Sequence, residues 1–253
     1  DEHRCFYAAN AGTEFELQDM TMAHCHADST SYSGSNGGGI FVGPGVIATL
    51  TRVVVSNSEA SSGYGSGIFV SCSAVLTVQG DSIIRDNSGA LNGAGLYVDS
   101  CTSGAGKPTV SLTDTVVTGN TAARGGAGIY VGASYSGGNV AFNLVSCKIT
   151  FNVVTSVGTD SSSSYNGAGI YTGAYIVPVI TRTLIEGNTG AAQGGGVYFG
   201  QSLTSITLTD VVVRENRALY RAGGVYLYGG SSGSVQTHAF TNVKFLSNEG
   251  SSL

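Results

Sequence analysis

The 253-residue sequence has no tryptophan, only three prolines and two methionines, and few charged residues, at 11%. No apolar run reaches the roughly 20 residues that a membrane-spanning helix needs, so we expect no membrane span. The first residues show no basic segment followed by an apolar one, and we therefore expect no signal peptide in this sequence. Disordered chains are usually rich in charge and poor in Val, Ile and aromatic residues, which excludes that class. The length is ample for a sizeable hydrophobic core.

Charge and cysteine content narrow the choice of partners and location. The net charge of −5 makes nucleic acid and anionic membrane surfaces poor partners. The sequence has five cysteines and no CxxC pair. Together with abundant Ser, Thr, Gly and Tyr and few Lys, the cysteines favour an oxidising location, either extracellular or at the cell surface.

An internal repeat organises almost the whole chain. Its first mark is a glycine followed by an apolar residue and then an aromatic one, and the glycines are Gly39, Gly67, Gly95, Gly128, Gly169, Gly196 and Gly224. Its second mark is an apolar residue three positions before an asparagine, and the asparagines are Asn57, Asn87, Asn120, Asn152, Asn188, Asn216 and Asn248. A fixed period of this kind is the signature of a solenoid.

The residues between the two marks predict β-structure. Apolar and hydroxyl residues alternate there, as in 110–114 and 206–210, which is typical of short strands. Three short strands in a repeat of about 32 residues leave no room for a helix, and therefore predict an all-β parallel β-helix of about 7–8 coils. We expect one domain over 1–253, as a segment of a longer protein, with 1–14 as an irregular start or a partial first coil.

The repeated positions predict stacked columns. Cys25 occupies the asparagine position in the first coil. The residues three positions before Cys25 and before each asparagine are apolar and should form an inward stack: Met22, Val54, Ile84, Val117, Ile149, Ile185, Val213 and Phe245. The seven asparagines should form a structural amide ladder at a turn, each side chain bonding to the next coil. The repeated glycines should allow a tight approach or a positive φ where the chain bends.

These motifs resemble a known family. Gly38-Gly39-Ile40 and Gly195-Gly196-Val197 approach the GGAI repeat of the chlamydial polymorphic membrane proteins, and Phe245-Leu246-Ser247-Asn248 matches their FxxN repeat. The resemblance covers nearly the whole chain from Phe15 onward. It implies a right-handed parallel β-helix displayed at a cell surface, with adhesive or structural work.

An enzymatic reading needs clustered carboxylates. β-Helix enzymes that act on acidic polysaccharides use such clusters for Ca²⁺ or acid–base work, together with basic residues that hold the substrate. Six positions before the asparagines, only Asp81 and Asp114 would lie on adjacent coils, about 5 Å apart. They are a weak candidate for a cation site, and the alternative is a turn-forming role. We therefore expect no catalytic residues, no metal and no cofactor, and a polysaccharide lyase or hydrolase is disfavoured.

Aromatic residues form a further column: Phe41, Phe69, Tyr97, Tyr130, Tyr171, Tyr198 and Tyr226. If the flanking Ile and Val residues point inward, strand alternation places all seven rings on the outside. Stacked rings at coil spacing stabilise one another. An exposed column of this size would also suit a platform for sugar rings, or a seam against a neighbouring rod or domain.

The cysteines allow specific pairings. Cys72 and Cys101 follow equivalent strands on consecutive coils, so a disulfide between them is geometrically plausible. Cys5 with Cys25 is a second possible pair, and Cys147 would then remain free or buried.

The sequence as a whole favours a non-catalytic structural or adhesive rod of a cell-surface or fibre assembly. We expect its partners to be other protein chains or neighbouring domains, joined end to end or side by side, because neither end shows a cap. Two alternatives remain open. One is a glycan-binding module that uses the exposed aromatic column on a surface polysaccharide, and the other is a polysaccharide-active enzyme.

Overall fold

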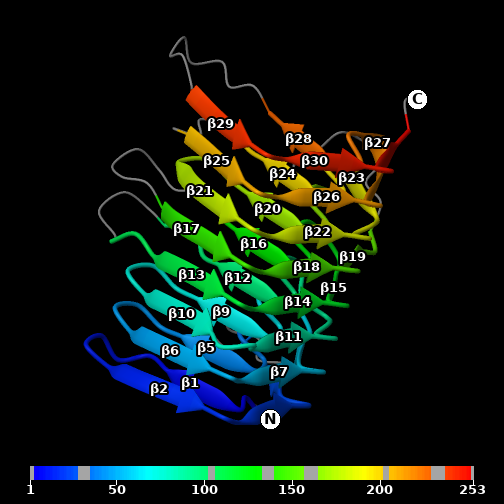
Figure 1. Ribbon diagram of the computed structural model, residues 1–253. Helices are drawn as coiled ribbons and strands as arrows, with labels where there is room; N and C mark the ends of the chain where they lie inside the picture. Colours follow the sequence, from blue (N-terminus) through cyan, green and yellow to red (C-terminus); the bar gives the residue numbers. More distant parts are fainter. Residues whose placement is uncertain are drawn as a thin grey trace.

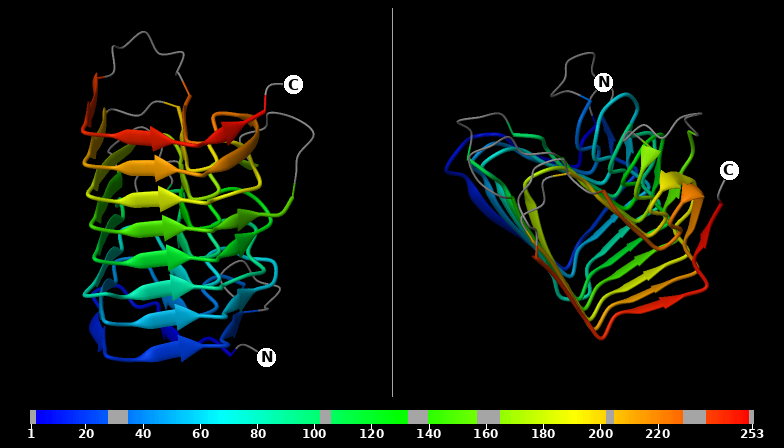
Figure 2. Two further views of the ribbon diagram at one scale, coloured as in Figure 1. Left: turned by 45° about the vertical axis from the view of Figure 1, so that its right-hand side comes forward. Right: turned by 90° about the horizontal axis from the view of Figure 1, so that it is seen from above.

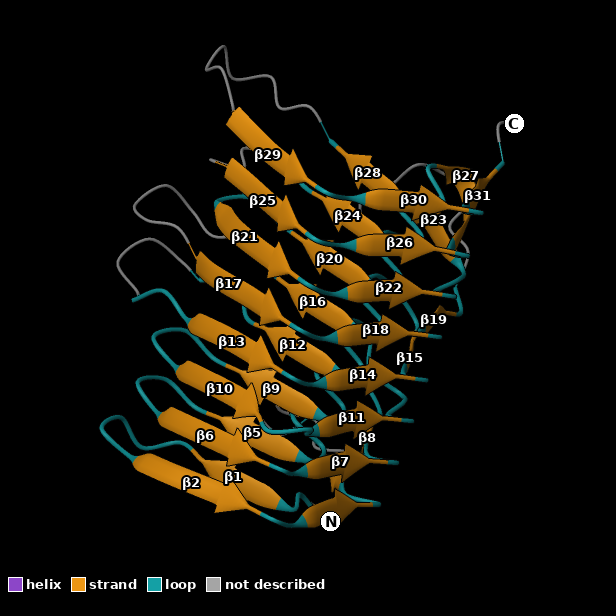
Figure 3. Ribbon diagram, viewed as in Figure 1, coloured by secondary structure: helices purple, strands orange, loops and turns teal. Residues whose placement is uncertain are grey.

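The computed structural model describes residues 3–27, 35–101, 106–132, 140–156, 165–201, 205–228 and 237–251. It confirms the predicted fold class, because the described residues form parallel stacked strands and no α-helix (Figures 1 and 3). In this part of the chain no helix has the length and hydropathy needed to cross a bilayer. From β6 (Ile47–Thr51) to β7 (Val54–Ser56) the chain runs left to right across the front of Figure 1, and successive coils stack upward towards the C-terminus, so the solenoid is right-handed.

Three long parallel sheets form the walls, and each contains eight strands, one per coil. The first sheet contains β1 (Phe6–Ala8), β5 (Ile40–Val42), β9 (Ile68–Val70), β12 (Leu96–Val98), β16 (Ile129–Val131), β20 (Ile170–Thr172), β24 (Val197–Phe199) and β28 (Val225–Leu227). The second contains β2 (Glu14–Gln18), β6 (Ile47–Thr51), β10 (Val75–Gln79), β13 (Thr109–Thr113), β17 (Val140–Val145), β21 (Ile176–Thr181), β25 (Ser205–Thr209) and β29 (Thr237–Thr241). The third contains β3 (Thr21–Ala23), β7 (Val54–Ser56), β11 (Ile83–Arg85), β14 (Val116–Thr118), β18 (Lys148–Thr150), β22 (Leu184–Glu186), β26 (Val212–Arg214) and β30 (Lys244–Leu246).

Seven of the eight coils add a fourth short strand that the repeat did not predict. These strands are β4 (His26–Ala27), β8 (Glu59–Ala60), β15 (Thr121–Ala122), β19 (Val153–Val154), β23 (Ala191–Gln193), β27 (Arg217–Arg221) and β31 (Glu249–Gly250), and they form small sheets beside the main coil. Small buried residues pack there as a second cluster, which includes Ala94, Ala127 and Ala168. The side lobe is small because its strands have two to five residues and its interior is filled mainly by alanine.

The main core follows from strand alternation. In the second sheet alternate residues such as Leu76 and Val78 are buried and their neighbours are partly exposed. In the first sheet Ile68 and Val70 are inward and fully buried, which turns the ring between them outward. The inward residues of all coils join in one continuous cluster, and from above the coils overlie one another (Figure 2).

The second coil departs from the predicted register by one residue. Val55, and not Val54, pairs with Met22 and Ile84, so Val55 is the inward residue. Asn57 therefore shifts outward to an exposed position with a φ of 50°. Asparagine is common in this left-handed region, which explains why an asparagine occurs one position before the true end of the repeat.

Candidate functional site

The amide ladder is the most regular internal feature. The Asn120 backbone N–H and Nδ2 both donate to Asn152 Oδ1, at 3.1 and 3.0 Å, and Nδ2 also donates to Ile84 O at 3.1 Å. The same pattern joins six asparagines: Asn87, Asn120, Asn152, Asn188, Asn216 and Asn248. The first five are fully buried, and their polar groups form hydrogen bonds that join adjacent coils.

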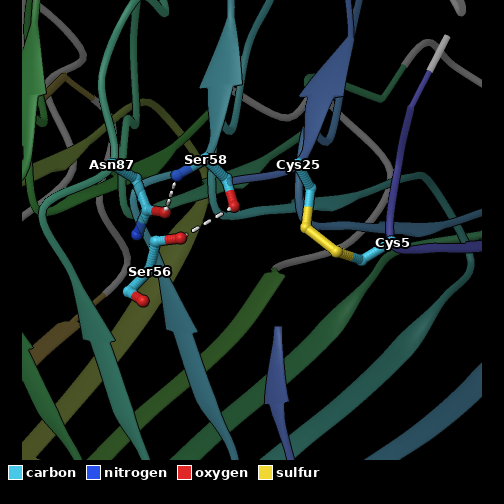
Figure 4. The surroundings of a disulfide bond; sticks show 5 residues. All are labelled: Cys5, Cys25, Ser56, Ser58 and Asn87. Carbon is cyan, nitrogen blue, oxygen red and sulfur yellow. Dashed lines mark hydrogen bonds between the residues drawn. A yellow bond between two sulfur atoms is a disulfide. The ribbon is translucent and has the colours of Figure 1, made fainter. Parts of the chain in front are cut away.

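Asn57 does not belong to this ladder. Ser58 takes the position, where its backbone N–H donates to Asn87 Oδ1 at 3.0 Å and its hydroxyl donates to Ser56 O at 3.2 Å (Figure 4). One coil earlier, Cys25 stands at the same place, since the backbone N–H of Glu59 bonds to Cys25 O. The ladder therefore begins at Asn87, and a serine and a cysteine precede it.

The repeated glycines pack directly against the ladder. A Cβ atom on Gly128 would lie 2.6 Å from Gly169 O and 2.8 Å from Asn152 Nδ2, both closer than real Cβ contacts allow. In the first coil Cys5 and Cys25 replace this glycine and asparagine and form a disulfide (Figure 4). A covalent bond thus closes the first coil, whereas a glycine packed against the ladder side chain closes the others.

The seven aromatic residues do form one stacked column on the outer side of the first sheet. Successive ring centroids from Phe41 to Tyr226 are 4.4–5.5 Å apart, and their planes differ by 2–13°. Tyr7 extends the column at its N-terminal end, 4.9 Å from Phe41. The guanidinium of Arg4 lies over the rings of both Tyr7 and Phe41.

The expected exposure of this column is wrong. Only Tyr130 and Tyr226 are partly exposed, and the other five rings are buried at 2–9% exposure. Tyr64 stacks on Tyr97 at 4.6 Å, and the turn before each strand folds against the column. A Cβ on Gly126, for example, would lie 2.7 Å from the Cβ of Tyr130. The outer side of the sheet is therefore a second, covered core.

Burial also changes the acidity of the tyrosines. Desolvation raises the pKa of Tyr130, and so does the hydrogen bond from its hydroxyl to Tyr171. Desolvation likewise raises the pKa of Tyr171 and Tyr198. The folded protein therefore favours the neutral form of all three phenols.

This geometry bears on the sugar-platform alternative. A sugar ring binds to the face of an aromatic ring, and along the column each face is covered by the next aromatic ring. Only the outermost rings, Tyr7 and Tyr226, end the stack. The column therefore offers no row of ring faces to a polysaccharide lying along the rod.

The sequence reasoning missed a column at the corner between the second and third sheets. Ser82, Thr115 and Thr183 each donate a side-chain hydrogen bond to a carbonyl two or three residues earlier, at 2.7, 2.9 and 3.0 Å. The free, buried Cys147 belongs to this column, with its thiol 3.4 Å from Val145 O. Desolvation raises the pKa of this thiol to about 11, so it stays protonated and unreactive. The hydroxyl residues that recur five positions before the ladder asparagines were the available signal.

The carboxylates lie at turns. Asp81 and Asp114 have φ of 64° and 48°, at the corner where the second sheet ends, as a turn-forming role requires. No group of three or more His, Cys, Asp or Glu residues in the described ranges is placed to hold a metal ion. In the second coil Arg52 occupies this column and binds Asp19, with Nη2 to Oδ2 at 2.9 Å. That hydrogen bond lowers the pKa of Asp19 to about 2.

A second disulfide joins Cys72 and Cys101, which follow β9 and β12 on consecutive coils. It lies outside the main core, after the strands of the first sheet. The two disulfides together tie down the N-terminal half of the solenoid.

Comparison with known proteins adds no relative. No protein-family model, curated protein or solved structure matches the chain.

Proposed function

We propose that this chain is a non-catalytic structural segment of an extracellular or cell-surface rod, whose work is assembly or adhesion with other protein chains. The observation that supports this most is the use of the repeated residues. The amides, the aromatic rings and the glycines all make contacts between adjacent coils. A rod is what such nearest-neighbour stacking builds.

Two further observations support the proposal. The disulfides Cys5–Cys25 and Cys72–Cys101 suit an oxidising compartment. The motif resemblance to chlamydial polymorphic membrane proteins points in the same direction. The glycan-binding alternative has less support, because the ring faces it would use are covered.

Electron microscopy of the full native protein tests the proposal. We expect rods that contact one another or neighbouring domains. Dispersed particles that bind or cleave a polysaccharide would contradict it. In that case Asp81→Ala and Asp114→Ala would test the enzymatic alternative, and Tyr226→Ala would test the glycan-binding one.

A further inference from the structure

The last coil exposes side chains that are buried in every inner coil. Phe240 and Phe245 are 46% and 50% exposed, whereas their partners in the preceding coil, Leu208 and Val213, are 1% and 0% exposed. An apolar hollow opens at this end, lined by Gly224, Val225, Leu227, Phe240, Phe245 and Asn248. Large apolar side chains exposed together on one face mark an interaction surface.

The amide ladder ends at the same face with hydrogen-bond donors. Asn248 Oδ1 accepts from the Asn216 backbone N–H and Nδ2 at 3.1 and 3.0 Å, and Asn248 Nδ2 donates to Val213 O at 2.8 Å. In the inner coils the asparagine N–H and the second Nδ2 hydrogen bind the oxygen of the next asparagine. Within the described residues nothing supplies that oxygen to Asn248, so these donors are available to an acceptor from a partner.

We propose that the C-terminal coil docks a further parallel β-helix coil of the same repeat type. That coil places an asparagine oxygen over Asn248 and apolar residues over Phe240 and Phe245. The inference rests on the proposed structural function and names its partner. It follows from continuity with the coil-to-coil interface that the chain already repeats seven times.

A second copy of this chain fits the face poorly. Its own C-terminal coil would oppose donors to donors at Asn248. Its N-terminal coil has Cys25 at the ladder position, engaged in a disulfide and without a side-chain oxygen. The His26 N–H of that coil is also already bonded, to His3 O at 3.1 Å. The partner is therefore a coil with an asparagine ladder, and not the end of another copy.

A tandem duplication of residues 217–248 in the full chain tests this inference. The duplicated coil should raise the thermal midpoint by roughly 3–6 °C, since each kcal/mol shifts Tm by about 2–4 °C at this size. It should also slow hydrogen exchange over 237–248. The change Asn248→Ala in the second copy should remove about half of the rise, and the matched control Thr241→Ala in the second copy, on the outer face, should keep it.

Two results would overturn the inference. One is a duplication that leaves both the midpoint and the exchange of 237–248 unchanged. The other is concentration-dependent dimerisation of the unmodified chain in sedimentation, abolished by Phe245→Asp, which would make a second copy the partner. The second result would leave the proposed structural function standing, whereas polysaccharide cleavage by the native protein would remove that function without touching this interface.

Discussion

The first and last coils are built from the same repeat but end differently. In the first coil the inward residues Leu17 and Met22 are 8% and 7% exposed, and a disulfide closes the ring between Cys5 and Cys25. In the last coil Phe240 and Phe245 are about half exposed, and the closing contact is only between Gly224 and Asn248. We infer from the difference that a coil of this repeat needs either a neighbour or a covalent closure to protect its core.

Removing the first disulfide, in the Cys5→Ser/Cys25→Ser double variant, should have the largest effect on the difference between the first and last coils. We expect a loss of about 3 kcal/mol in the free energy of unfolding, as for a disulfide that closes a loop of this size. Hydrogen exchange over 6–27 should rise to the level of 237–250. The Cys72→Ser/Cys101→Ser variant is the control, and it should leave exchange in the first coil unchanged. A first coil that stays protected without its disulfide would show that the bond does not close it.

Replacing a repeated glycine by alanine should destabilise the protein more in the middle of the rod than at its C-terminal end. Gly128→Ala forces a Cβ against the backbone carbonyl of Gly169 and should cost about 2–3 kcal/mol. Gly224→Ala should cost less than about 1 kcal/mol, because its nearest contacts are side-chain atoms of Asn248 at 3.1 Å or more. Urea denaturation of both variants measures the difference. Equal losses would mean that the glycine column does not depend on the next coil.

The amide ladder gives a similar but smaller contrast. Asn152→Ala leaves buried donors and acceptors on both neighbouring coils unpaired, and should cost about 2 kcal/mol. Asn248→Ala breaks contacts with one neighbour only, so we expect roughly half that loss. Thermal unfolding of the two variants checks the order, and a larger loss at Asn248 would contradict the ladder account.

The fold could be predicted from the sequence because a glycine and an asparagine recur at fixed positions in nearly every coil. It could not predict Ser58 in the ladder, since a serine can satisfy the same turn and Asn57 happens to precede it. It also could not predict that the aromatic column is covered. That covering depends on turns that fold back at glycines such as Gly126, and on Tyr64, which lies outside the repeated motif. The alanine-filled side lobe was missed because strands of two residues leave no periodic pattern.

Alkaline pH should reveal the covered aromatic column through a modest loss of stability. Burial raises the pKa of Tyr130 and Tyr198, so the folded state favours the neutral phenols. Their contribution is complete below the unfolded pKa near 10 and is lost as the pH rises above it. We expect the thermal midpoint to fall between pH 9 and 11.5, and to fall less in Tyr130→Phe. An identical fall in that variant would mean that this phenol is not protected from solvent.

Native-state hydrogen exchange along the whole chain tests the central claim most directly. If each coil is stabilised by its neighbours, protection should be highest in the inner coils from β12 to β26, lower in the disulfide-closed first coil and lowest in β28 to β31. Protection in the last coil equal to that of the inner coils would contradict the account. It would mean that the exposed core and the unpaired ladder end do not lower the stability of the last coil.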